Sequence, residues 1–251
     1  MPPLRLRLVT AFVMNVKKIS YAWGLWIFGG YFATRLLVVI LCTVSLDRIF
    51  EVNKSDLSLF EACAEIFGEI LAAAVAWILI KKYYEVKTDN LGKSALGLIS
   101  TSRCHVMGSI LGGFILASSI ISLEFLFPTS TAGGASVFDK FTMNGVAIRY
   151  SWLVVGILVA PFVEELLFRG VVFSIIKSHL NDICGAIVSV MAFMLVHVTQ
   201  IGHDWKSALA IFALGMTCAT VRVKGMSLWL AVSVHASYNA CLTLWSVIYP
   251  Y

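Results

Sequence analysis

The sequence carries few charges. Charged residues make up 13% of its 251 positions, whereas hydrophobic residues make up 59%. A soluble globular domain is typically about a quarter charged and about half apolar. The apolar runs recur along the whole chain instead of gathering in one segment. The composition therefore excludes an ordinary soluble domain and predicts a protein that crosses the membrane several times.

Several common catalytic signatures are also missing. The chain has no HExxH helix of the zinc proteases and no GxSxG turn of the serine hydrolases. Its six cysteines are scattered singly without CxxC spacing, and we predict no disulfide. The net charge of +5 could suggest nucleic acid, but the basic residues flank apolar segments, as membrane topology requires. We therefore expect no nucleic-acid partner.

A membrane-spanning helix needs about 20 mostly apolar residues. Segments of this kind predict an all-α fold, a polytopic transmembrane helical bundle of about seven spans, with six to eight as the range. The expected spans are roughly residues 21–46, 61–80, 105–127, 150–176, 183–201, 207–221 and 226–249. The basic segment before the first span lacks a cleavage site, so we interpret it as retained rather than as a signal peptide.

The basic residues between the spans predict the orientation. With the N-terminus inside, twelve basic residues flank the inner ends of the spans and five flank the outer ends, which is the bias expected of an inner N-terminus. Residues 128–149 have the turn composition of an outside loop. We therefore expect residues 1–127 to form a basic segment and about three helices, and residues 150–251 to form a core of about four helices.

The fourth span contains charges that are costly in a membrane. Its sequence LVAPFVEELLFRGVVF places two adjacent carboxylates, Glu164 and Glu165, just after Pro161. Proline cannot donate an N–H, so a kink is expected there. Glu165 and Arg169 are four residues apart with the acid first, which favours an ion pair on one helix face. Glu164 points about 100° away and has no local basic partner.

Two later spans add polar side chains at helical spacing. In AFMLVHVTQ, Phe193 and His197 are four residues apart, and in WLAVSVHASYNACLTLW, His235 and Asn239 have the same spacing. Ionisable groups inside a membrane nearly always face the bundle interior or a wet cavity. We therefore expect Glu164 and these polar residues to share one site.

At these residues the sequence resembles a known family. EELLFR, FMLVH and HASYN are similar, in this order, to the three motifs of the CAAX protease and bacteriocin-processing family, also called the Abi family. Members are intramembrane endopeptidases of the CAAX-prenyl-protease type. The resemblance covers roughly residues 150 to 245. Each motif lies on a separate apolar segment, as the family requires.

The resemblance implies a role for each motif residue. Glu164 would activate a water molecule, and His197, His235 and Asn239 would position that water and stabilise the oxyanion. Glu165 and Arg169 match the remaining motif positions and would hold the site together, while Phe193 supports His197 by packing. No cofactor is required in this reading. A buried carboxylate as base and an amide as oxyanion donor are also what peptide hydrolysis needs chemically.

Two alternatives remain open at this point. Glu164, His197 and His235 could instead bind a catalytic zinc ion, because three protein ligands plus one open position are usual for such zinc sites. The chain could also be a proton-coupled transporter or a non-catalytic membrane scaffold, since carboxylate and histidine relays occur there too. We expect a peptide or protein substrate that enters from the lipid bilayer. The compact size favours a prokaryotic plasma membrane.

The remaining intramembrane charges receive structural interpretations. Arg35 is expected to snorkel or pair, and Glu65 and Glu69 to reach the membrane interface, because they lie near a predicted helix end. The predicted spans also place His235 roughly 8–10 Å deeper in the membrane than His197, at 1.5 Å per residue. A tilt or shift of the fifth span would be needed to remove that offset.

Overall fold

The computed structural model describes residues 20–49, 54–87, 94–127, 153–202 and 204–249. The expected all-α membrane bundle is confirmed, since every regular element in these ranges is helical. The elements are α2 (Tyr21–Ile49), α3 (Lys54–Lys87), α5 (Arg103–Leu126), η1 (Val155–Val159), α8 (Ala160–Glu165), η2 (Leu166–Val172), α9 (Phe173–His179), α10 (Asp182–Val196), α11 (Val198–Ile201), α12 (Trp205–Gly225) and α13 (Leu228–Ile248).

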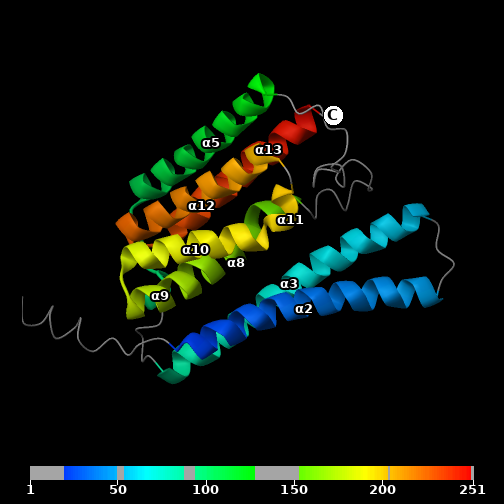
Figure 1. The fold of residues 1–251 in the computed structure, drawn as a ribbon, viewed down its shortest axis with the longest axis horizontal. Coiled ribbons are helices and arrows are strands. Elements are labelled where there is room, and N and C mark those ends of the chain that lie inside the picture. Colours follow the sequence, from blue (N-terminus) through cyan, green and yellow to red (C-terminus); the bar gives the residue numbers. More distant parts are fainter. Residues whose placement is uncertain (1–19, 50–53, 88–93, 128–152, 203, 250–251) are drawn as a thin grey trace, which may run out of the picture.

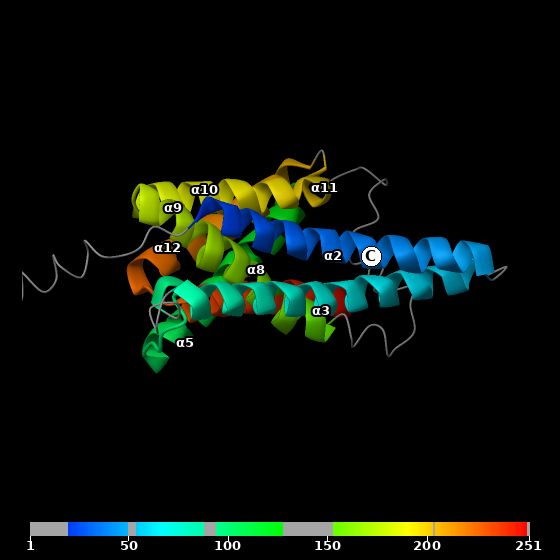
Figure 2. The ribbon, with the colours of Figure 1, turned by 90° about the horizontal axis from the view of Figure 1, so that it is seen from below.

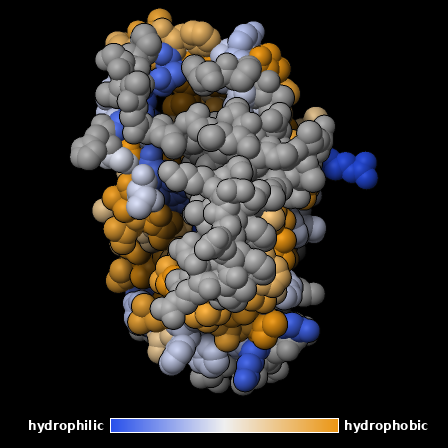
Figure 3. All heavy atoms as spheres, turned by 90° about the vertical axis from the view of Figure 1, so that its right-hand side faces the viewer, coloured by the Kyte–Doolittle hydropathy of each residue, from blue (hydrophilic) through white to orange (hydrophobic). Residues whose placement is uncertain are grey.

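The outside of the bundle is apolar. Within the described ranges, α2, α3, α5 and α12 each contain a stretch long and apolar enough to cross a membrane, and α10 is a shorter apolar helix. Large apolar side chains point outward, among them Leu25 and Trp26, which are 74% and 72% exposed. Hydrophobic side chains also cover much of the described surface in Figure 3. Such a surface suits lipid rather than water.

The helices form a hairpin and a larger group beside it. Helices α2 and α3 pack against each other along their length, while α5 packs against α13 and α12. Helices α5 and α13 approach each other closely at Gly113. A Cβ added there would collide with the Ser237 hydroxyl and the Val234 carbonyl. Figures 1 and 2 show the hairpin running beyond the other helices at the end away from α9.

The segment before α5 is clamped to one end of the bundle. Ser174 donates to the carbonyl of Ala95 at 2.5 Å, and Arg222 donates to the same oxygen at 3.2 Å. Gly97 has a φ of +76°, and a Cβ there would meet the guanidinium of Arg222. The Gly97 carbonyl accepts from the amide of Leu228 at 2.7 Å. These bonds tie the chain before α5 to the α12–α13 turn.

Some sequence-based predictions concern residues outside the described ranges. The basic N-terminal segment and the expected loop 128–149 both lie there. The fourth expected span, 150–176, begins among those residues and continues to His179 in α9. The inner position of the N-terminus stays a prediction.

Candidate active site

The helix that carries the two glutamates is irregular on both sides of them. Residues 155–159 and 166–172 form the π-helical turns η1 and η2, and α8 lies between them. π-Helical turns are rare and often occur at functional sites. Pro161 sits in the first turn of α8, where its missing N–H alters the bonding pattern. The regular α-helical pattern is thus interrupted just before this proline by a π-helical turn, and the expected kink stays a prediction.

The π-helical turn leaves one carbonyl for a side chain. The amide of Ala160 donates to Val155, not to Gly156. Pro161, the next residue in the π-helical pattern, has no N–H to give to Gly156. The amide nitrogen of Asn239 fills this place and donates to the Gly156 carbonyl at 2.8 Å. Asn239 is thereby fixed on the helix of the glutamates, with one N–H left over.

Glu165 and Arg169 form a sealed ion pair, as their spacing predicts. Both side chains are 0% exposed, and Arg169 Nη1 lies 2.9 Å from Glu165 Oε1. Arg169 Nη2 donates to the Gly215 carbonyl at 2.8 Å, and its guanidinium lies 4.7 Å from the ring centroid of Phe193. His235 Nδ1 lies 2.9 Å from the same Glu165 oxygen. The pair thus joins η2, α12 and α13 behind the site.

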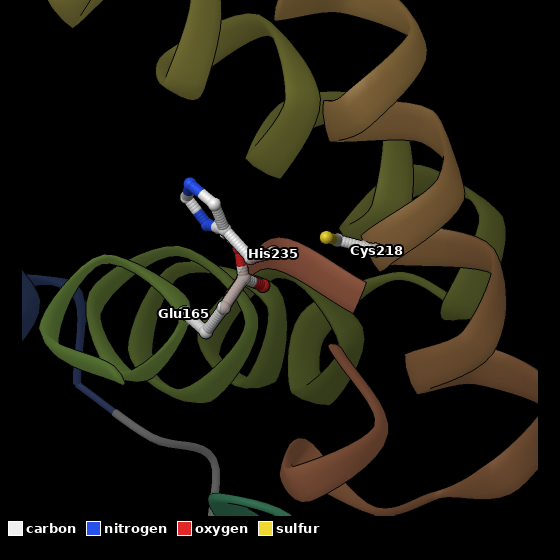
Figure 4. Close-up of side chains that lie close together, drawn as sticks. All are labelled: Glu165, Cys218 and His235. Atoms are coloured by element: carbon white, nitrogen blue, oxygen red, sulfur yellow. Dashed lines mark hydrogen bonds and ion pairs between the residues drawn. The ribbon is translucent and has the colours of Figure 1, made fainter. Parts of the chain in front are cut away.

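A thiol faces this pair from α12. Candidate ligand atoms of Glu165, Cys218 and His235 all lie within 4.8 Å of one another, and all three residues are buried. Figure 4 shows the sulfur of Cys218 pointing toward the other two side chains. Glu165 Oε2 has no hydrogen-bond partner among the described residues, and a thiol is a weak donor. Cys218 could not be predicted as part of the site, because a lone cysteine in an apolar run has no spacing signal.

The fifth span ends as an α-helix at the motif histidine. His197 is the C-cap of α10, and its amide donates to Met194 at 3.1 Å instead of to Phe193. The freed Phe193 carbonyl lies 2.7 Å from Nδ1 of the His197 ring. A carbonyl only accepts, so Nδ1 carries a proton, and in the neutral ring Nε2 is an acceptor. The continuous helix expected over 183–201 is therefore wrong, because the chain tightens at His197 before α11.

Both histidines face Glu164. Nε2 of His197 and Nε2 of His235 each lie 3.8 Å from Glu164 Oε2. The expected depth offset between the two rings is therefore wrong, because each reaches the same carboxylate oxygen. The side chain of Glu164 is 20% exposed and that of His197 is 14% exposed. His235 donates from Nδ1 to the Glu165 carboxylate, so its Nε2 is an acceptor as well in the neutral ring.

A cavity of about 450 Å³ brings the predicted catalytic residues together. It is lined by Glu164, His197, His235 and Asn239, whereas Glu165 and Arg169 lie behind its wall. Phe193 also lines the cavity, and its ring centroid lies 4.3 Å from that of His197. Helices α8, α10, α12 and α13 all supply lining residues. The site is therefore a hollow within the bundle, open in part to its surroundings.

The N-terminal hairpin also reaches this cavity. Tyr31 and Arg35 of α2 and Glu69 of α3 belong to its lining. Glu69 is 3% exposed and pairs with Arg35, so its expected position at the membrane interface is wrong. Helix α3 begins at Lys54, earlier than the predicted span, and this places Glu69 well inside the helix. The expectation that Arg35 pairs is confirmed.

Comparison with known proteins agrees with this arrangement. Residues 147–241 match the family model described as type II CAAX prenyl endopeptidase Rce1-like, and this range contains all three motifs. The chain is similar to the Rce1-like family over this range. It is also 25% identical over 176 residues to the "Putative membrane peptidase YdiL" of Bacillus subtilis (strain 168), covering 69% of this chain and 68% of that protein. No solved structure matches the chain.

The family match and the similarity to a membrane peptidase support the broad class of the protein. It is an integral membrane protein and a peptidase of the CAAX type. The family match lies over the helices that build the cavity, and α2 and α3 fall outside it. The hairpin residues in the cavity wall therefore lie outside the matched range.

Proposed function

We propose that the protein hydrolyses peptide bonds with a water molecule activated by Glu164. The observation that carries this proposal is the convergence of two imidazole nitrogens on one partly exposed carboxylate oxygen, each at 3.8 Å. That separation is too long for a direct hydrogen bond. A water molecule between the three groups would lie within hydrogen-bonding reach of each of them.

The histidine protonation states favour water binding. Because Nδ1 of each ring donates to Phe193 or Glu165, each Nε2 offers a lone pair toward Glu164. Water has two hydrogens, so it can donate one to Glu164 and the other to the Nε2 lone pair of either His197 or His235, and these bonds orient it. In their neutral form the rings cannot donate to an oxyanion, so the proposal gives this task to Asn239. Its second N–H remains available beside the bond to Gly156.

The reaction then needs one proton carrier. Glu164 removes a proton from the water as the water oxygen bonds to the carbonyl carbon of the substrate. The negative charge that forms on the carbonyl oxygen is stabilised by the free N–H of Asn239. The C–N bond breaks as Glu164 returns the proton to the leaving amine. Glu165 and Arg169 touch no reacting atom and position His235.

The substrate in this proposal is a peptide or protein segment that enters from the bilayer, and no nucleic acid is involved. The support is the apolar outer surface around a largely apolar cavity in which the polar site residues converge. A prokaryotic plasma membrane is the proposed location, consistent with the Bacillus subtilis relative. The transporter and scaffold alternatives would require neither the convergence on Glu164 nor a bound peptide.

The test is peptide hydrolysis by the purified protein and by Glu164→Gln. Loss of a general base should lower turnover by about 10²–10⁴-fold. Glutamine keeps the size of the side chain, so the variant should insert in membranes and unfold at a similar temperature. Near-normal turnover in Glu164→Gln would rule out Glu164 as the base that activates the water. Equal inactivity of both proteins toward a broad peptide library would instead favour a transporter or scaffold.

Zinc-dependent hydrolysis is the second candidate, and a specific observation favours it. Each histidine turns Nε2 toward Glu164 and gives Nδ1–H to a carbonyl or carboxylate, which is the pattern that orients zinc-binding histidines. The donor set of two imidazoles and a carboxylate fits zinc, which would supply an activated water. Glu164, His197 and His235 would hold the ion.

Metal analysis separates the two candidates. The glutamate–water proposal expects full cleavage after chelation and dialysis, with less than stoichiometric metal throughout. Stoichiometric zinc in the wild type that is lost in His235→Ala, together with activity restored by added zinc, would favour the metalloprotease. Asn239→Ala serves as the control, because an amide that bonds to Gly156 should not change metal content.

A further inference from the structure

Arg35 and Arg169 both lie within apolar helices of this bundle, and they differ in exposure. Arg169 is 0% exposed, with its charge enclosed by Glu165 and two aromatic rings. The side chain of Arg35 is 42% exposed, although it lies in the membrane-length stretch Tyr21–Cys42 of α2. A charged side chain at such a depth is expensive and usually marks a functional pathway. Arg35 lines the same cavity as Glu164.

Arg35 is held in place from behind. Its Nη1 lies 3.2 Å from Oε2 of Glu69, a carboxylate whose side chain is 4% exposed. The other oxygen of Glu69 accepts from the Tyr31 hydroxyl at 2.5 Å. Tyr31 and Glu69 are both buried, and Tyr31 lies one turn before Arg35 on α2. The buried pair fixes one edge of the guanidinium, and the exposed remainder faces the cavity.

Charges around Arg35 come from several elements. Glu69 is its ion-pair partner on α3, Glu65 lies one turn before Glu69, and Glu164 faces the cavity from α8. Among the described residues that line the cavity, Arg35 is the side chain with a permanent positive charge. A guanidinium has five N–H donors in a planar fork, which can bind a second carboxylate while one edge is occupied.

We propose that Arg35 binds a carboxylate of the peptide substrate and thereby sets which peptide bond lies at Glu164. This inference rests on the proposed peptidase function. A carboxylate that enters an apolar cavity loses water and needs a cationic partner there. The group is either the C-terminal carboxylate or an acidic side chain, since both have the same planar chemistry. Arg35 is thus a specificity residue, and Tyr31 and Glu69 position it.

The experiment compares matched peptides that differ in one carboxylate. One peptide carries a free C-terminal acid, the second carries a C-terminal amide, and the third has its acidic side chains replaced by amides. The wild type should cleave one carboxylate form at least about 10-fold better than its amide counterpart in kcat/KM, mainly through KM. The arm that shows the preference identifies the source of the carboxylate.

Arg35→Gln should reduce this preference to about 2-fold or less, whatever its effect on the absolute rate for the amide peptide. Arg35→Lys should retain part of it, since a point charge remains. The ratio between two peptides in one protein sample does not depend on the folded fraction, so a partly unstable variant still gives an answer. The control is Arg103→Gln, an exposed arginine at the start of α5, which should keep the full preference.

Binding to Glu164→Gln keeps this test separate from the peptidase proposal. That variant should bind the preferred carboxylate peptide about 10-fold more tightly than its amide, and adding Arg35→Gln should abolish the difference. Equal binding of both peptides, or an equal loss for both in Arg35→Gln, would overturn the carboxylate assignment. Failure of cleavage with intact selective binding would overturn the peptidase mechanism alone.

Discussion

Glu164 and Glu165 are neighbours in the chain, but they face two different environments. Glu165 is 0% exposed and shares one oxygen between Arg169 and His235, each at 2.9 Å. Glu164 is 20% exposed and meets only two ring nitrogens at 3.8 Å within the described bundle. Successive helical residues diverge by about 100°, which is enough to place one carboxylate behind the wall and the other inside the cavity.

The comparison shows how one helix can hold both a rigid support and a reactive group. Glu165 is neutralised and hydrogen-bonded, so it suits the fixation of His235 and not proton transfer. Glu164 keeps space beside it, so it can exchange a proton with a substrate. The sealed side and the open side of α8 should therefore respond differently to substitution.

The largest effect on stability is expected on the sealed side. Arg169→Ala leaves Glu165 as an uncompensated buried charge, which typically costs about 3–5 kcal/mol. Thermal and denaturant unfolding in detergent would measure this loss. Adding Glu165→Gln to the same chain should restore part of it, and a double variant that loses the plain sum of the two single losses would contradict a direct pair.

A surface ion pair supplies the control for that prediction. Lys177 and Asp182 lie 2.9 Å apart, but their side chains are 44% and 45% exposed. Exposed pairs contribute about 0–1 kcal/mol. Lys177→Ala should therefore barely change unfolding. Comparable losses in Lys177→Ala and Arg169→Ala would remove the distinction between the sealed side and the surface.

On the open side, a smaller effect should appear in turnover rather than in stability. Asn239→Ala removes the proposed oxyanion donor, which typically lowers kcat by about 10²–10³-fold with little change in KM. Steady-state kinetics would measure both constants. Ser233→Ala, on the same helix with its hydroxyl bonded to the Trp229 carbonyl, is the control and should keep kcat. A stable, fully active Asn239→Ala would show that this amide only ties α13 to Gly156.

The smallest effect is expected at Asp204, the N-cap of α12, which belongs to neither the sealed nor the open side of α8. Asp204 accepts from the amides of Lys206 and Ser207 at 3.2 and 3.1 Å, and from the Ser207 hydroxyl at 2.8 Å. Loss of such a cap costs about 0.5–2 kcal/mol. Partial burial acts to raise the pKa of Asp204, but these hydrogen bonds outweigh it and hold the pKa below its usual value of 3.8.

The pH dependence of Asp204 follows from that lowered pKa. Its contribution is complete above the usual pKa and is lost as the pH falls through the lower pKa of the folded state. The gap in unfolding temperature between wild type and Asp204→Ala should therefore be constant from neutral pH to about pH 5 and narrow at about pH 3. A gap that widens at low pH would contradict this capping role.

Spacing along single helices was enough to find most of the site. The pairs Glu165–Arg169 and His235–Asn239 could be predicted because residues four apart share a helix face. That the three motifs meet at Glu164 could be predicted because isolated polar groups are costly in a membrane and therefore gather in the bundle interior. These rules act locally or on average, and they do not depend on how the helices are arranged.

The features of the site that could not be predicted from the sequence depend on contacts between helices. The carbonyl of Gly156 becomes available only because η1 is π-helical, and its partner Asn239 is far away in the chain. The ring nitrogen that faces Glu164 depends on whether Phe193 or Glu165 accepts the other proton. The role of Arg35 depended on the packing of a hairpin that carries no motif. Local periodicity contains none of this information.

The bond between Asn239 and Gly156 also has an evolutionary consequence, because it makes two distant positions epistatic. Pro161 creates the need for an outside donor, since a residue with an N–H at position 161 could bond to Gly156 itself. In a Pro161→Ala background, Asn239 would be released from its structural task and keep only its chemical one. Loss of Asn239 would then be tolerated by the fold while still harming catalysis. The proline and the asparagine are therefore expected to constrain each other's substitution, although 78 positions separate them in the chain.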